Sequence, residues 1–183
     1  MKKLFIILGL AALTAGLAGA QETRTVAAMV STPADDTKTN SDAVPQGYAI
    51  NSQFQRVVLL RFKFKADLLA GIKDMVKQEK IKNAVILAGI GSVRGYSYHA
   101  TVNREFPSQD CFVKNPTGSA DIAGMNGYVI GGRVHAHITF ANPDKCFGGH
   151  LEPGTEVFAF AIVTLGVLDD DLDLSKIDDK TYR

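Results

Sequence analysis

The stretch RVHAHITFANPDKCFGGHL, residues 133–151, has the pattern of a β-hairpin and carries three of the four histidines in the chain. Side chains two residues apart on a strand point to the same side of a sheet, so His135 and His137 project together. The central ANPDK is typical of a turn, because proline fixes φ and asparagine and aspartate bond to their own backbone. The chain is therefore predicted to fold back and return His150 toward this pair.

The register of the hairpin decides how close the histidines come. In one register Ala141 pairs with Cys146. This register places His150 directly across from His137, and a register shifted by two residues places it across from His135. Either pairing puts three imidazoles on one face, whereas a shift of one residue would turn His150 to the other face.

Three imidazoles at cross-strand Cβ spacings of roughly 5–8 Å suit one divalent metal ion, and neutral imidazoles favour zinc. Three protein ligands leave one position for water, as in catalytic zinc sites. Glu152 shares the face of His150 and is a candidate for a carboxylate behind the ligands or for a general base. The alternative is that His135, His137 and His150 are polar groups on a half-exposed sheet face or at a subunit contact.

Other polar side chains could belong to the same region. His99 shares a predicted strand face with Ser97 and Thr101, and we interpret it as structural rather than as a fourth metal ligand. Arg94 and Arg133 are candidates for binding a small anionic ligand near the hairpin, since a guanidinium group suits carboxylates. The alternative for either arginine is a surface ion pair.

The N-terminus predicts export. Two lysines, an apolar run and the small-x-small sequence at residues 18–20 are typical of a cleaved signal peptide over residues 1–20, with a periplasmic or secreted product. The apolar run is short for a membrane span, and no second apolar stretch of 18 residues follows, so no span is predicted in the mature chain. We expect a flexible leader at residues 21–47, one domain at residues 48–168 and an acidic tail at residues 169–183.

Charge argues against nucleic acid as a partner. Residues 1–20 hold two of the 20 Lys and Arg residues and none of the 19 acidic ones, which leaves a formal net charge of −1 on the mature chain. Binding to a phosphate backbone requires a concentration of Lys and Arg. The two cysteines, Cys111 and Cys146, would lie in an oxidising compartment after export, where a disulfide and two free thiols both remain open.

The remaining pattern favours an α+β fold, a single domain with a mainly antiparallel sheet and one main helix. The apolar residues after Asp67 recur at helical spacing, and the other segments alternate like strands. Strands are expected at residues 56–64, 84–90, 96–102 and 119–125, from residue 128 onward, and at 156–168, the last of them buried on both faces. A helix is expected after Asp67. The connections are a glycine-rich bend or bulge at 89–95, a loop at 105–118 and a hairpin-type turn at 126–127.

The order of these motifs resembles the plant-and-prokaryote-conserved (PPC) domain family. The likeness covers roughly residues 48–168 and rests on AVILAGIGSV at residues 84–93, on His135-Ala136-His137 and on GGHL at residues 148–151. The resemblance implies an α+β fold and a homotrimer. The fold is also similar to that of acetolactate decarboxylase, a zinc enzyme in which His-x-His and a third histidine hold the metal, which implies His135, His137 and His150 as the matching residues.

The chain also departs from the family. In plants this domain follows AT-hooks in nuclear DNA-binding proteins, but the sequence has no AT-hook and carries an export signal. Residues 110–118 also lack the apolar strand that usually precedes the His-x-His hairpin. The first hypothesis is therefore an exported PPC-domain protein with a three-histidine metal or small-ligand site, whether or not it is an enzyme. The alternatives are a metal-dependent lyase or hydrolase resembling acetolactate decarboxylase, and a DNA-binding protein.

Overall fold

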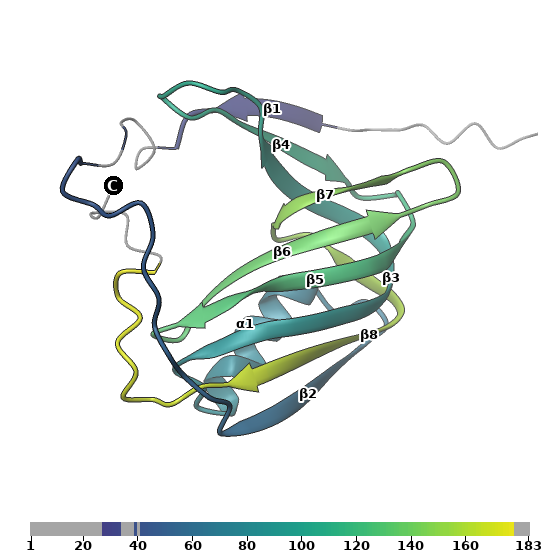
Figure 1. Cartoon of the computed structure of the whole chain (residues 1–183). Coiled ribbons are helices and arrows are strands. Elements are labelled where there is room, and N and C mark those ends of the chain that lie inside the picture. Colours follow the sequence, from purple (N-terminus) through teal and green to yellow (C-terminus); the bar gives the residue numbers. More distant parts are fainter. Residues whose placement is uncertain (1–26, 34–38, 40, 178–183) are drawn as a thin grey trace, which may run out of the picture.

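Strand β3, Ala84–Thr101, is the longest element and pairs with four other strands. Its first part runs between β8 and β5, and its second part runs between β4 and β7. The computed structural model describes residues 27–33, 39 and 41–177. In that part of the chain the other elements are β1 (Ala27–Ser31), β2 (Arg56–Lys63), α1 (Leu68–Gln78), β4 (Asp110–Asn115), β5 (Ala120–Ile130), β6 (Arg133–Ala141), β7 (Cys146–Leu151) and β8 (Glu156–Val167), as Figure 1 shows.

Strands β3, β5, β6 and β7 form a closed circuit of hydrogen-bonded neighbours. β5 pairs with the first part of β3, β6 with β5, β7 with β6, and β7 returns to the second part of β3, always antiparallel. β8 and β2 extend the sheet from β3 on one side, and β4 and β1 extend it on the other. The circuit therefore brings the predicted hairpin, β6 and β7, against a strand that lies far away in the sequence (Figure 1).

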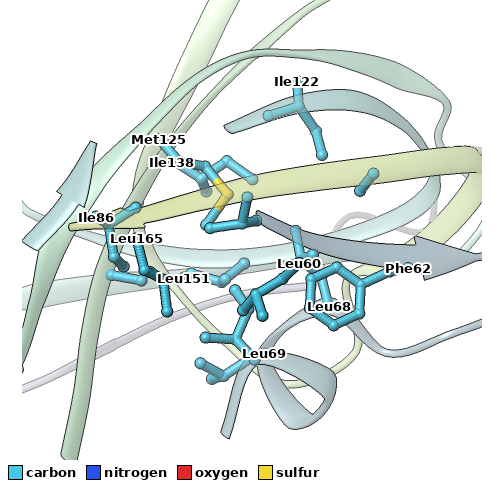
Figure 2. Close-up of a cluster of buried hydrophobic side chains, with 14 of the residues drawn as sticks. Leu60, Phe62, Leu68, Leu69, Ile86, Ile122, Met125, Ile138, Leu151 and Leu165 are labelled. Carbon is cyan, nitrogen blue, oxygen red and sulfur yellow. The ribbon is translucent and has the colours of Figure 1, made fainter. Parts of the chain in front are cut away.

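Helix α1 covers one face of the sheet and encloses the core. It begins after Asp67, whose carboxylate oxygen Oδ1 accepts a hydrogen bond of 2.9 Å from the backbone N–H of Ala70 and so caps the first turn. Four apolar residues of the helix are buried at helical spacing. Figure 2 shows core side chains of the helix and the strands together: Leu60, Phe62, Leu68, Leu69, Ile86, Met125, Ile138 and Leu165.

The alternation of β6 separates this core from an outer face. Ala136, Ile138 and Phe140 are buried. The residues that alternate with them, which include His135 and His137, therefore point to the side of the sheet away from the core. The outer face is where the predicted site must be sought.

The predicted α+β fold, with a mainly antiparallel sheet and one helix, is confirmed. The predicted hairpin is also confirmed, and its register is the one in which Ala141 pairs with Cys146 and His137 with His150. The helix begins where the sequence predicts it. Among the residues that the structure describes, no helix has the length and apolarity needed to cross a bilayer.

Two predicted breaks in the sheet are wrong. Residues 84–102 were expected as two strands joined by a glycine-rich bend or bulge. β3 runs through this segment as one strand with register shifts near Gly91 and Gly95, so the predicted break is wrong, while the bulge alternative for these glycines is confirmed. The turn expected at Asn126-Gly127 lies inside β5, and the chain turns instead at Gly131-Gly132, both of which have positive φ.

The polar segments are more ordered than their composition predicts. Residues 105–118, expected as a loop, contain β4, and residues 21–47, expected as a flexible leader, contain β1, which pairs with β4. In the expected tail, Leu174 is buried beside Ile130 and Leu168. Strand β8 matches the predicted strand, but burial on both faces holds only toward its end, because Phe158 and Phe160 are exposed. The predicted signal peptide, residues 1–20, lies outside the described residues.

Candidate metal centre

Backbone pairing places three histidines in one row across the outer face. His137 on β6 is the registered partner of His150 on β7, and His150 is in turn the partner of His99 on β3. The rings of His99 and His150 stack with centroids 4.6 Å apart and 13° between their planes. The ring of His137 lies 5.5 Å from that of His150.

The pair His135 and His137 stands at one end of this row. Their rings are nearly parallel, 9° apart, and their Nε2 atoms are separated by 3.3 Å. The ring of His135 also lies 4.8 Å from the ring of His150. The structure therefore places the rings of the three predicted ligands side by side, with centroids 4.8–5.5 Å apart.

The tautomer of His150 follows from its backbone contact. Nδ1 lies 3.1 Å from the carbonyl oxygen of Leu151. A carbonyl can only accept, so Nδ1 donates this hydrogen bond and Nε2 retains its lone pair. A histidine held in this way by its own strand is oriented for metal binding through Nε2.

His99 lies between two carboxylates. Its Nδ1 is 2.7 Å from Oε1 of Glu152, and its Nε2 is 3.7 Å from Oδ2 of Asp110. Asp110 is buried, and its other oxygen accepts a hydrogen bond of 3.0 Å from the hydroxyl of Thr101. Oε1 of Glu152 is also 3.7 Å from Nδ1 of His150. These contacts fix the ring of His99 beside the row and connect Glu152 to two imidazoles.

The position of His99 is what sequence reasoning missed. The sequence predicts a structural role for it, yet the ligand atoms of His99, His150 and Glu152 lie within 4.8 Å of one another, so these three residues form an alternative ligand set to His135, His137 and His150. The strand face was read correctly from the alternation of residues 97–101. The pairing of β3 with β7 has no local signal, so the sequence offered nothing that placed His99 next to His150.

Two of the histidines resist protonation. Partial burial lowers the pKa of His150 below its usual value, and repulsion from His99 and His135 lowers it further, against smaller opposing effects of the Leu151 carbonyl and Glu152. Partial burial by its surroundings also lowers the pKa of His137, followed by repulsion from His135 and His99. Metal ions bind neutral imidazole, so a lowered pKa keeps both side chains available as ligands in mildly acidic solution.

The predicted arginines have different positions. Arg94 forms an ion pair with Glu156, with Nε and Oε1 2.9 Å apart, and its guanidinium lies over the ring of Phe64. Arg94 therefore forms a surface ion pair, which was the alternative to its binding a small anionic ligand. Arg133 is exposed at the start of β6, across from Ile130 and two residues before His135 on the same face. Its role as an anion anchor stays a prediction.

The cysteines take no part in the cluster. Cys111 and Cys146 are free thiols, so of the two open possibilities the structure shows free thiols rather than a disulfide. Cys111 lies on β4 across from Ala100, and Cys146 begins β7 across from Ala141. Cys146 is four positions along the strand from His150, roughly 13 Å at the usual rise of a strand, so it is too far away to share a metal ion with His150.

Solved structures share this fold. The metal-containing protein AF0104 from Archaeoglobus fulgidus is 22% identical, with a TM-score of 0.57, and the match covers 74% of this chain and 96% of that one. A PPC protein from Pyrococcus horikoshii is 26% identical, with a TM-score of 0.53, covering 66% and 85%. A putative DNA-binding protein from Bacteroides thetaiotaomicron is 14% identical, with a TM-score of 0.51, covering 63% and 83%.

The family assignment rests on the sequence itself. No curated protein matches the chain. Residues 50–169 match the model of the Plants and Prokaryotes Conserved (PCC) domain, the family called PPC above, and this span contains every strand from β2 to β8 and the whole histidine cluster. The chain therefore belongs to the PCC domain family.

Proposed function

We propose that this chain is a metal-binding member of the PCC family in which His135, His137 and His150 hold one divalent ion, with zinc as the first expectation. The observation that carries the proposal is the separation of 3.3 Å between the Nε2 atoms of His135 and His137. A tetrahedral ion with Zn–N bonds of about 2.0–2.1 Å requires its ligand nitrogens to lie about 3.3–3.4 Å apart. The pair thus already has the spacing of two ligands on one ion.

The third ligand and the outer residues support the same assignment. His150 presents Nε2 because Nδ1 is held by the Leu151 carbonyl. His99, Glu152 and Asp110 then form a layer behind His150, where hydrogen-bonded carboxylates and stacking orient a ligand. The structural neighbour from Archaeoglobus fulgidus is described as metal-containing, which agrees with this role. A zinc ion with three protein ligands acts as a Lewis acid toward water or a carbonyl group.

Elemental analysis of the purified chain tests the proposal. We expect a near-integral ratio of metal to protein, and loss of the metal in the His137→Ala variant. Thr139→Ala is the matched control, because Thr139 is the next outward position on β6 and is exposed. It should retain the metal. Absence of metal from the unaltered chain after dialysis against zinc would overturn the proposal.

A metal-dependent lyase or hydrolase resembling acetolactate decarboxylase is the second candidate function. The residue that would serve it is Glu152, whose carboxylate joins the cluster 3.7 Å from Nδ1 of His150. Release of carbon dioxide from acetolactate by the zinc-loaded chain, abolished in Glu152→Gln with the metal retained, would support this activity. Turnover by Glu152→Gln at the unaltered rate would exclude Glu152 as the acid–base residue.

Two further expectations, about localisation and oligomeric state, belong to the same proposal. Export follows from residues 1–20, and mass spectrometry of the protein recovered from the periplasm or medium would show a chain beginning at Gln21. Assembly as a homotrimer is what the family resemblance implies, and apolar side chains on the outer face agree with a subunit contact there, among them Val57, Leu59 and Ile90, which are 58%, 71% and 55% exposed. Light scattering during gel filtration would give the mass of the assembly.

Binding to DNA is not part of the proposal. The neighbour from Bacteroides thetaiotaomicron is called a putative DNA-binding protein, but its 14% identity shows a shared fold alone. The net charge of −1 expected for residues 21–183 disfavours contact with a phosphate backbone. Tight binding to DNA in a gel shift at physiological salt would contradict this and favour DNA binding over the proposed functions.

A further inference from the structure

A pocket of about 310 Å³ adjoins the His135 and His137 end of the cluster. It lies on the outer face, and its walls come from β5, from β6 and from the segment after β8. Its volume is at the lower end of the range for small-molecule sites, about 300–1,000 Å³. The described residues that line it are Asn126, Gly127, Tyr128, Ile130, His135, His137 and Ile177.

The wall contributed by the C-terminal segment is held by packing. Leu174 is buried against Ile130 and Leu168, which draws this segment onto the end of β5. The hydroxyl of Tyr48 donates a hydrogen bond to the carbonyl of Lys176, next to Ile177. Figure 1 shows this segment, in yellow, running from the end of β8 past the turn between β5 and β6. A part of the chain expected as an acidic tail thus supplies an apolar side of the pocket.

The pocket has two chemically different ends. Tyr128, Ile130 and Ile177 form an apolar side, and Tyr128 and Ile177 remain 45% and 41% exposed, ready to be covered by a ligand. The imidazoles of His135 and His137 form the polar end. None of the described residues that line the pocket is acidic. A divalent cation held by neutral imidazoles would place positive charge at this end of the pocket, where a ligand carboxylate can approach it.

We propose that this pocket binds a small monocarboxylate with a compact apolar or aromatic tail, the carboxylate toward His135 and His137 and the tail against Tyr128 and Ile177. The inference rests on the proposed metal site. Arg133, across from Ile130 on the same strand face, adds a second positive charge at the rim. Covering the exposed ring of Tyr128 and the side chain of Ile177 favours benzoate over acetate, because both have the same head group and only benzoate buries apolar surface.

The experiment uses the full chain loaded with cobalt(II), whose visible absorption reports a change in its ligands. Acetate and benzoate are titrated separately, with metal content measured in each sample. We expect benzoate to bind at least about tenfold more tightly than acetate. The preference should fall at least about threefold in Ile177→Ser and in Tyr128→Thr, and stay unchanged in Leu59→Ser, which alters an exposed apolar residue of β2.

The outcomes separate the two proposals. If cobalt does not bind at all, the metal site itself is wrong. If cobalt binds but acetate and benzoate have equal affinity, or neither binds, the metal site stands and the monocarboxylate pocket is overturned. If the metal-free chain binds benzoate as tightly as the loaded chain in a calorimetric titration, the placement of the carboxylate at the histidine end is overturned. Because Tyr128 and Ile177 are both partly exposed, their variants should fold, and circular dichroism checks that they do.

Discussion

The imidazole ring of His99 stacks face to face on that of His150, at 4.6 Å, while its Nδ1 lies 2.7 Å from Glu152. His99 therefore supports His150 without needing to bind the ion itself. We predict that His99→Ala lowers metal affinity about 10–100-fold, as expected for a residue behind the ligands, whereas His150→Ala abolishes binding. Competition with a chromogenic zinc chelator measures both.

The opposite pattern would identify a different ligand set. If His99, His150 and Glu152 hold the ion, then His99→Ala abolishes binding and His135→Ala leaves it intact. His150 belongs to both sets and does not discriminate between them. The comparison of His99→Ala with His135→Ala is thus the decisive one.

The lowered pKa values of His137 and His150 predict how the stability of the metal-free chain depends on pH. Below about pH 6.5 these histidines take up protons in the unfolded chain but resist them in the folded one. The contribution of these two neutral histidines to the free energy of unfolding is therefore complete above about pH 6.5, and it is lost as the pH falls toward the lowered pKa values. Urea unfolding followed by circular dichroism between pH 8 and pH 5.5 should show the decline.

A double variant isolates this effect from other titrations. Replacing both His137 and His150 by glutamine removes the two groups while keeping polar side chains of similar size. The free energy of unfolding should then change less between pH 6.5 and pH 5.5 than it does in the unaltered chain. An equal decline in both proteins would assign the pH dependence elsewhere.

Gly149 lets β7 approach β3 closely at the centre of the site. A Cβ atom on Gly149 would overlap the backbone carbonyl oxygen of His99, whereas a Cβ on Gly124 of β5 has no atom within 4 Å. We predict that Gly149→Ala destabilises the fold by about 1–3 kcal/mol and weakens metal binding, because β7 must shift. Gly124→Ala is the control, and thermal unfolding should show little change. Equal melting temperatures for the two variants would refute this account.

Asp67 connects the helix to the turn that follows β7. Oδ1 caps α1 through Ala70, and Oδ2 accepts a hydrogen bond of 2.6 Å from the backbone N–H of Gly154. We predict that Asp67→Ala costs about 1–3 kcal/mol, since it removes a helix cap and leaves a partly buried N–H without a partner. Asp74→Ala, an exposed change within the same helix, should cost much less. Urea unfolding compares the two.

The hairpin could be predicted from sequence because its signals are local. Alternating side chains fixed the faces of His135 and His137, and the ANPDK turn limited the register to a few choices, one of which pairs His137 with His150. The continuity of strand β3 could not be predicted, because its glycines were compatible with either a bend or a bulge, and only the pairing with β8 shows bulges. His99 belongs to the histidine cluster because it pairs with His150, 51 positions further along the chain, and the alternation of side chains carries no information about such a pairing.

β4 and the C-terminal segment could not be predicted for the same reason, namely that local sequence does not reveal long-range contacts. β4 lies in a segment rich in Pro, Ser, Asp, Asn and Gly, and it is ordered by β3 on one side and β1 on the other. Leu174 could not be recognised as buried, since its acidic surroundings predicted a solvated tail. Both segments derive their structure from distant contacts.

The closed circuit of β3, β5, β6 and β7 has a consequence for the order of folding. β7 completes the ring by pairing with the second part of β3, and this long-range step brings His150 beside His99. Contacts between residues far apart in the sequence form slowly, because loop closure costs entropy before the contacts offset it. The three proposed ligands lie on the β6–β7 hairpin, whereas the support of His99 behind His150 comes only with ring closure. Tight metal uptake during refolding would therefore follow ring closure, and a stopped-flow zinc indicator would time that step directly.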